Sequence, residues 1–158
     1  MARSSWLVAS ILALALGACG PAATTTTAAS APATTTEMTP EQIQAALSQL
    51  PAPYNTANYD AGRSSFAQCR ACHAIGSNRV GPNLAGVFGR TAGTAPDFSY
   101  SDALKNAGFT WDAEHLDHWL TNPREFLPGN RMAFIGIRDE AQRRNLIAYL
   151  MIESKQPQ

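Results

Sequence analysis

Two cysteines and a histidine stand together near the middle of the chain. The string Cys69-Arg70-Ala71-Cys72-His73 places two thiols three positions apart and an imidazole directly after the second. This spacing is the attachment signature of a c-type haem, because each thiol can add to a porphyrin vinyl group and the imidazole can bind the iron as its proximal ligand. A bare Cys-x-x-Cys also occurs in zinc sites and redox dithiols. Zinc would need two further ligands, and a redox dithiol is expected within a βαβ pattern; the sequence offers neither a second cysteine pair nor that pattern.

A haem iron needs a sixth ligand or an open position. After His73, the candidates are His115, His118, Met132 and Met151. The two histidines fall on an expected helix among acidic residues, which is typical of solvated side chains, and Met151 falls in an apolar helical stripe, which is typical of a core. Met132 lies in a loop that contains Pro and Gly and is followed by a Phe. It is the best candidate, and a thioether favours Fe(II) and raises the reduction potential.

The segments around these residues read as short helices separated by loops rich in Gly and Pro. Apolar residues at helical spacing predict helices over 59–69, 101–107, 112–120 and 139–151, with Gln142 at the capping-box position of the last. No internal repeat or alternating strand pattern interrupts them. We therefore expect an all-α domain over 57–158, wrapped around one large apolar cofactor that supplements a small core.

The chain begins like an exported protein. Residues 1–18 carry Arg3 and then an apolar run too short to span a bilayer of about 30 Å. The run ends at Leu16-Gly17-Ala18-Cys19, which resembles the lipobox of bacterial lipoproteins and predicts cleavage before a lipid-modified Cys19. Ordinary signal-peptide cleavage, with Cys19 incidental, is the alternative and would leave the protein soluble. The haem motif and Cys19 account for all three cysteines, so we expect no disulfide.

Residues 19–56 connect this leader to the domain. Their first half is almost entirely Ala, Thr, Pro and Ser, which predicts a flexible linker. From Thr39 a short helix is expected, with Thr39 as its cap, Pro40 at its first position and Gln42 completing a capping box. The sequence leaves open whether this helix docks on the domain. The chain has 12 basic and 12 acidic residues, a balance that argues against nucleic acid as a partner.

The domain resembles class I cytochrome c, close to mitochondrial cytochrome c and its bacterial relatives. The likeness covers about residues 59–153 and rests on several blocks in one order. These are Cys69-Arg70-Ala71-Cys72-His73, Gly81-Pro82-Asn83-Leu84, Gly86-Val87-Phe88-Gly89-Arg90, Phe98-Ser99-Tyr100-Ser101-Asp102-Ala103, Asn122-Pro123, Pro128-Gly129-Asn130-Arg131-Met132-Ala133-Phe134 and Leu146-Ile147-Ala148-Tyr149-Leu150.

The resemblance implies a role for each matching position. One haem c would be attached through Cys69 and Cys72, with His73 as the proximal and Met132 as the distal iron ligand. Pro82 matches the residue whose carbonyl accepts the other ring N–H of the proximal histidine. A set of three polar side chains matches the groups that hold a buried haem propionate: Arg90, Tyr100 and Trp111. Asn130 stands where the family has a Thr near the propionates.

The resemblance also implies a function: an electron carrier rather than an enzyme, passing one electron through the haem edge. Its donor would be a quinol–cytochrome c reductase, and its acceptor a terminal oxidase or a photosynthetic reaction centre. Together with the leader, this predicts a periplasmic protein held at the membrane by Cys19, since bacteria attach c-type haem outside the cytoplasm. The alternative is a haem enzyme or ligand-binding protein, such as a peroxidase, whose sixth ligand is labile.

Overall fold

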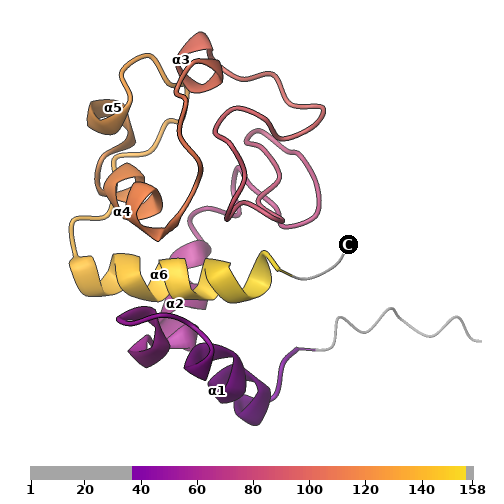
Figure 1. Cartoon of the computed structure of the whole chain (residues 1–158), viewed down its shortest axis with the longest axis vertical. Coiled ribbons are helices and arrows are strands. Elements are labelled where there is room, and N and C mark those ends of the chain that lie inside the picture. Colours follow the sequence, from indigo (N-terminus) through magenta and orange to yellow (C-terminus); the bar gives the residue numbers. More distant parts are fainter. Residues whose placement is uncertain (1–36, 156–158) are drawn as a thin grey trace, which may run out of the picture. The chain divides into compact units, whose positions relative to one another are not determined.

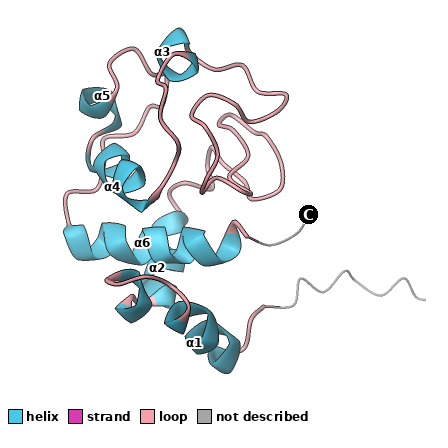
Figure 2. Ribbon diagram, viewed as in Figure 1, coloured by secondary structure: helices cyan, strands magenta, loops and turns pink. Residues whose placement is uncertain are grey.

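The computed structural model describes residues 37–155 of the 158-residue chain. Six α-helices and one short 3-10 helix follow one another in this range, joined by long loops (Figures 1 and 2). Their bounds are α1 Pro40–Ser48, η1 Tyr54–Thr56, α2 Tyr59–Phe66, α3 Asp102–Lys105, α4 Ala113–Thr121, α5 Pro123–Phe126 and α6 Glu140–Glu153. No strand forms within residues 37–155, where bridge-type pairing is confined to Thr91 and Thr110. The all-α prediction is confirmed.

The crossing of α2 and α6 forms the centre of the fold. Leu146, Ile147 and Ala148 of α6 have no exposed surface. At Gly62 of α2 the backbones approach so closely that an added Cβ would collide with the carbonyl oxygen of Asn145. Only glycine permits that approach, and it lets the two helices bury their apolar faces against each other.

Helix α1 is part of the same compact unit. Thr39 and Gln42 form the expected capping box, in which the Thr39 amide donates to Gln42 Oε1 over 2.8 Å. Leu47 and Leu50 are buried in the core with α6, and Glu37 pairs with Arg63 of α2 at 3.2 Å. Helix α1 and Glu37 therefore belong to the same compact unit as the residues from position 57 on. The leader, Cys19 and the first part of the linker lie outside the described residues.

Helix α6 begins with a different cap from the one expected. The Asp139 carboxylate accepts from the Gln142 amide over 2.7 Å, so half of a capping box is present. The Gln142 side chain does not return to Asp139 but donates to Ser65 Oγ of α2 over 3.2 Å. The capping-box pattern thus predicted where α6 starts. It did not predict that the Gln142 side chain would bond to Ser65 of α2 instead of closing the box.

The described helices are all too short or too polar to cross a membrane. They position two long loop regions on one side of the α2–α6 pair, which Figure 1 shows above α6, while α1 lies below it. One loop region follows α2 and carries His73, and the other, residues 127–138, links α5 to α6 and carries Met132. We call the second the methionine loop.

Candidate functional site

The two thiols and the imidazole lie on a tight turn that continues from α2. The Cys69 carbonyl oxygen accepts hydrogen bonds from the amides of Cys72 at 3.0 Å and His73 at 2.8 Å. Cys69 is half-buried and Cys72 is exposed, and both carry free thiols. Burial raises the pKa of the Cys69 thiol to about 11, so it is protonated at neutral pH. The turn places all three groups of the motif at the edge of the loop region.

The His73 ring is fixed by two contacts from the segment that returns past the motif. Its Nδ1 lies 2.9 Å from the carbonyl oxygen of Pro82, which leaves Nε2 as the nitrogen that can bind a metal. Gly81 lies flat against the ring, where an added Cβ would approach Nδ1 and Nε2 to 2.7 Å each. The Gly81 amide also donates to the Cys72 carbonyl over 2.7 Å. Sequence reasoning assigned Pro82 but missed Gly81, whose signal was its position directly before that proline.

Arg90 and Trp111 are brought together by backbone pairing. The Trp111 amide donates to the Arg90 carbonyl over 2.9 Å, and the Gly89 amide donates to the Trp111 carbonyl over 2.8 Å. The Arg90 guanidinium turns back to the segment after Pro82, donating to Asn83 O at 2.8 Å and Ala85 O at 3.1 Å. Those bonds use two of its five N–H groups, which leaves donors for an anion.

Tyr100 completes this polar group. It is buried, and the positive charge of Arg90 partly opposes the rise in the Tyr100 pKa that burial causes. Burial lowers the pKa of Arg90 and raises the pKa of Tyr100. Tyr100 also lines an open recess of about 520 Å³, together with Arg131 of the methionine loop. Arg90, Tyr100 and Trp111 thus come from separate segments, and a guanidinium, a phenol and an indole each carry an N–H or O–H group that can donate to a carboxylate.

Met132 is half-buried in the methionine loop, and both ends of that loop are tied down. At the N-terminal end, the Asn130 side chain bonds to Pro123, Leu127 and Met132. At the C-terminal end, the Ile137 amide donates to Leu120 O of α4 over 2.8 Å. Gly136 packs so tightly on the backbone of Thr121 that an added Cβ would collide with it.

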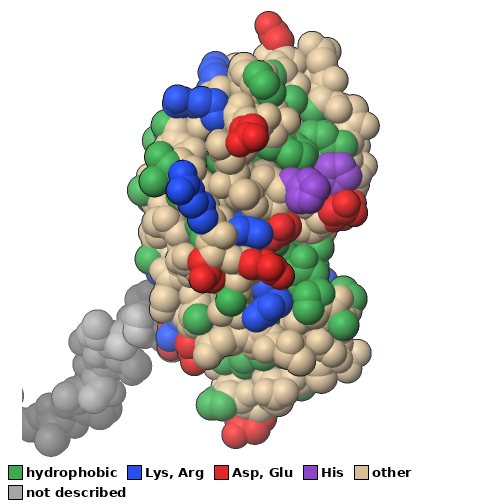
Figure 3. Space-filling view, turned by 90° about the vertical axis from the view of Figure 1, so that its left-hand side faces the viewer, with side chains coloured by type: hydrophobic (Ala, Val, Ile, Leu, Met, Phe, Trp, Pro, Cys, Tyr) green, Lys and Arg blue, Asp and Glu red, His purple; other side chains and the backbone are tan. Residues whose placement is uncertain are grey.

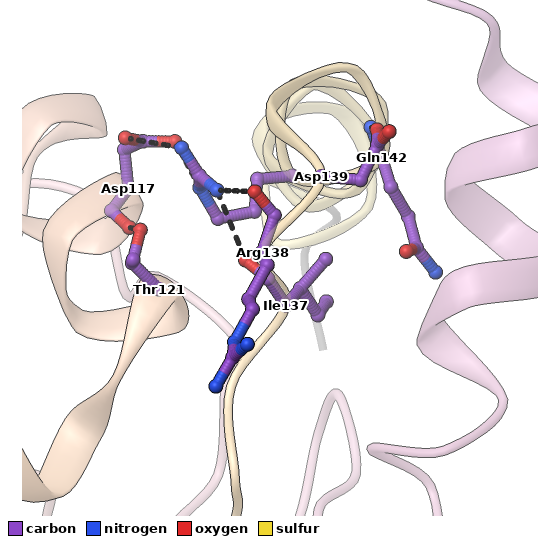
Figure 4. Close-up of polar contacts among 7 residues, drawn as sticks. Asp117, Thr121, Ile137, Arg138, Asp139 and Gln142 are labelled. Atoms are coloured by element: carbon purple, nitrogen blue, oxygen red, sulfur yellow. Dashed lines mark hydrogen bonds and ion pairs between the residues drawn. The ribbon is translucent and has the colours of Figure 1, made fainter.

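Polar contacts hold the C-terminal end of the loop at Ile137 and Arg138 and reach Asp117 of α4 (Figure 4), and the side chain that makes them is Arg143 of α6. Its guanidinium pairs with the Asp117 carboxylate of α4 at 2.8 Å and 3.2 Å. The same guanidinium donates to the carbonyl oxygens of Ile137 and Arg138, each at 2.9 Å. One buried side chain therefore joins α6, α4 and the loop. Sequence reasoning did not assign Arg143, since its partner Asp117 is far away in the sequence and nothing in the sequence pairs the two.

The other candidate ligands are placed differently. His115 stacks on Phe109 with ring centroids 4.7 Å apart and has its Nδ1 2.8 Å from Asp112. His118 is exposed, and Met151 is buried in the α6 stripe of the core. Within residues 37–155, no group of three or more His, Cys, Asp and Glu side chains is arranged to hold a metal ion by itself.

Comparison with known proteins identifies the family of this chain. Residues 59–152 match the family model described as cytochrome c. The chain belongs to the cytochrome c family. It is 50% identical over 93 residues to cytochrome c-550 of Bradyrhizobium diazoefficiens, covering 57% of this chain and 68% of that one. It is 49% identical over 94 residues to cytochrome c2 of Rhodoblastus acidophilus, covering 58% of this chain and 88% of that one.

Among solved structures, cytochrome cH from Methylobacterium extorquens matches with a TM-score of 0.59 and 45% identity, covering 60% of this chain and 98% of that one. Membership in the family makes the chain an electron-transfer protein, not an enzyme, that carries covalently attached haem c. The residues present fit such a group. Two free thiols lie on one turn, an imidazole is held with Nε2 available, and Gly81 packs so closely on that ring that any side chain there would collide with it.

Proposed function

We propose that this cytochrome holds its haem through Cys69 and Cys72, with His73 and Met132 as the axial iron ligands. The contact that carries the proposal is the 2.9 Å approach of His73 Nδ1 to the Pro82 carbonyl. It fixes the tautomer and orientation of the ring and raises the basicity of the other nitrogen. Bound at this site, the haem supplies an iron that takes up and releases one electron.

The surrounding side chains adapt the site to electron transfer. The Met132 thioether is a soft ligand that favours the reduced iron and so raises the reduction potential. Arg90, Tyr100 and Trp111 provide donors for a propionate that would be costly to bury unpaired. With ligands on both faces, the iron has no position for a substrate, which suits an electron carrier rather than a peroxidase.

Covalent attachment is tested by removing both thiols. The Cys69→Ala, Cys72→Ala double variant is expected to lose all haem during extraction with acidified organic solvent, whereas the wild-type chain keeps its colour. The double variant is also expected to fold poorly, because the bound group stabilises only the native state. Haem released by the wild-type chain under the same extraction would contradict the proposal.

Electron partners follow from the family resemblance. We propose that a quinol–cytochrome c reductase reduces this cytochrome and that a terminal oxidase or a photosynthetic reaction centre oxidises it. Both signs of charge are interspersed on the face of the molecule in Figure 3, and the chain has 12 basic and 12 acidic residues. Docking with little net charge predicts that turnover with the reductase depends only weakly on ionic strength. A steep loss of rate between low and physiological salt would contradict this.

We propose that residues 1–18 are an export signal and that a lipidated Cys19 holds the protein on the periplasmic side of a membrane. Residues 20–36 would form the tether, since Glu37 already belongs to the compact unit. Within the compact unit, helix α1 lies on the side of α6 opposite the loops that carry His73 and Met132 (Figure 1). Several acyl chains on one cysteine suffice for stable anchoring.

The tether is tested by fractionating cells that express wild-type protein and Cys19→Ser. The variant is expected in the soluble periplasmic fraction with an unchanged visible spectrum, and the wild type is expected to need detergent for release. Wild-type protein that washes off membranes in buffer alone would support ordinary signal cleavage instead.

A further inference from the structure

The side-chain amide of Asn130 bonds to backbone groups of α5 and of the methionine loop, including that of Met132. Its Nδ2 donates to Pro123 O over 2.7 Å and to Leu127 O over 2.8 Å. Its Oδ1 accepts from the Met132 amide over 2.9 Å. An asparagine amide has two N–H groups, and both are used here.

These partners connect the methionine loop to the core. Pro123 is the first residue of α5 and is fully buried, and Leu127 is the C-cap residue directly after α5. The amide therefore joins both ends of a short helix to the backbone of Met132. The opposite end of the loop is held separately. There the Ile137 amide donates to the Leu120 carbonyl of α4, and the Arg143 guanidinium donates to the Ile137 carbonyl.

The pattern of partners selects asparagine chemically. Two carbonyl oxygens require two N–H donors, and one backbone N–H requires an acceptor. An aspartate would keep the acceptor but place a charged oxygen against two carbonyls. A threonine, the residue that the family resemblance leads one to expect here, has one hydroxyl and cannot replace three bonds.

We propose that Asn130 is a positioning residue for Met132, holding the thioether at the iron instead of binding a propionate. This inference rests on the proposed ligation of the iron by Met132. A thioether on a tethered loop competes with external ligands through its effective concentration at the iron, which falls when the loop is free to move. Releasing these bonds lowers that effective concentration by about tenfold, the factor that corresponds to one typical net hydrogen bond.

The test uses the loaded, full-length protein and added imidazole as the competing ligand. Oxidised wild type and the variants Asn130→Ala, Asn130→Asp and Asn130→Thr are titrated with imidazole while the near-infrared methionine–iron band is followed. The apparent affinity for imidazole is expected to rise about tenfold in the Ala and Asp variants and less in the Thr variant. Asn58→Ala serves as the control, because Asn58 caps α2 through the Ala61 amide at 2.9 Å and lies outside the methionine loop. It is expected to lower the unfolding midpoint and leave the imidazole affinity unchanged.

A measurement on the wild type alone covers the case in which the variants do not fold. The Met132 amide proton, held by Asn130 Oδ1, is expected to exchange with solvent slowly in hydrogen-exchange experiments. Rapid exchange of that proton, or an imidazole affinity in the Asn130 variants equal to that of wild type, would overturn the positioning role while the proposed ligation stands. If the wild type lacks the methionine–iron band, the proposed ligation fails, and this inference fails with it.

Discussion

The carbonyl oxygen of Pro82 lies 2.9 Å from Nδ1 of His73, on the segment that also brings Gly81 flat against the same ring. The hydrogen bond leaves Nε2 as the nitrogen that would bind the iron in the proposed site, and the absence of a side chain at position 81 allows the ring to occupy its position. Proposed ligation by His73 thus depends on a glycine that would itself make no bond to the iron.

The contact of Gly81 with His73 predicts the effect of adding one methyl group. Gly81→Ala would bring a Cβ within 2.7 Å of two ring nitrogens, so the ring or the segment must shift and the bond to Pro82 is strained. We expect a lower yield of haem-loaded protein and a lower urea midpoint. The control is Gly89→Ala, where φ is +82° but an added Cβ meets nothing, so only backbone strain of about 1 kcal/mol is expected. Equal effects of the two substitutions would argue against the packing role of Gly81.

The ion pair between Arg143 and Asp117 predicts a large loss of stability when it is broken. Arg143→Met removes four hydrogen bonds and leaves the carboxylate and two carbonyl oxygens without the guanidinium. We expect the free energy of unfolding, measured in urea, to fall by about 3 kcal/mol. Arg138→Met is the matched control at an exposed neighbouring position and should change it by less than about 0.5 kcal/mol. If Arg143→Met lowers the free energy of unfolding by less than about 1 kcal/mol, the ion pair and hydrogen bonds of Arg143 contribute little to stability.

Docking of α1 predicts that a residue outside the family match contributes to stability. Leu47 is buried against the core, so Leu47→Ala should lower the free energy of unfolding by about 3 kcal/mol. Gln44→Ala, at an exposed position on the same helix, is the control and should be nearly neutral. If both variants unfold at the wild-type urea concentration, α1 does not belong to the cooperative unit.

The hydrogen bond between Tyr59 and Glu153 predicts a loss of stability in alkali. The two oxygens are 2.6 Å apart, and burial together with the carboxylate raises the pKa of Tyr59 well above its ordinary value. Because the raised pKa favours the neutral phenol in the fold, this stabilisation is complete below about pH 10 and is lost as the pH rises beyond it. The free energy of unfolding should therefore fall between about pH 10 and pH 12. Tyr59→Phe should flatten that fall, and identical pH profiles for the two proteins would refute the assignment.

Local signals in the sequence predicted much of this structure. The capping box at Thr39 and Gln42, the start of α6 after Asp139 and the haem motif each depend on residues within a few positions of one another. Their physics is short-range, so it is visible in a short stretch of sequence.

Contacts between distant residues could not be predicted in this way. Asp117 and Arg143 form an ion pair because α4 and α6 pack together. The Gln142 side chain bonds to Ser65 of α2 instead of to the backbone of Asp139. The bonds from the Asn130 amide to Pro123 and Leu127 were likewise not predicted. Each of these depends on a backbone path that only the folded chain defines.

The near-infrared absorption spectrum of the oxidised wild-type protein at neutral pH tests the central claim most directly, with Met132→Ala as its reference. The wild type is predicted to show the methionine–iron band and to bind no carbon monoxide when reduced. The Met132→Ala variant is predicted to lack the band, bind carbon monoxide and have a lower reduction potential. A wild-type spectrum without the band, together with rapid carbon monoxide binding, would contradict an electron carrier ligated by His73 and Met132.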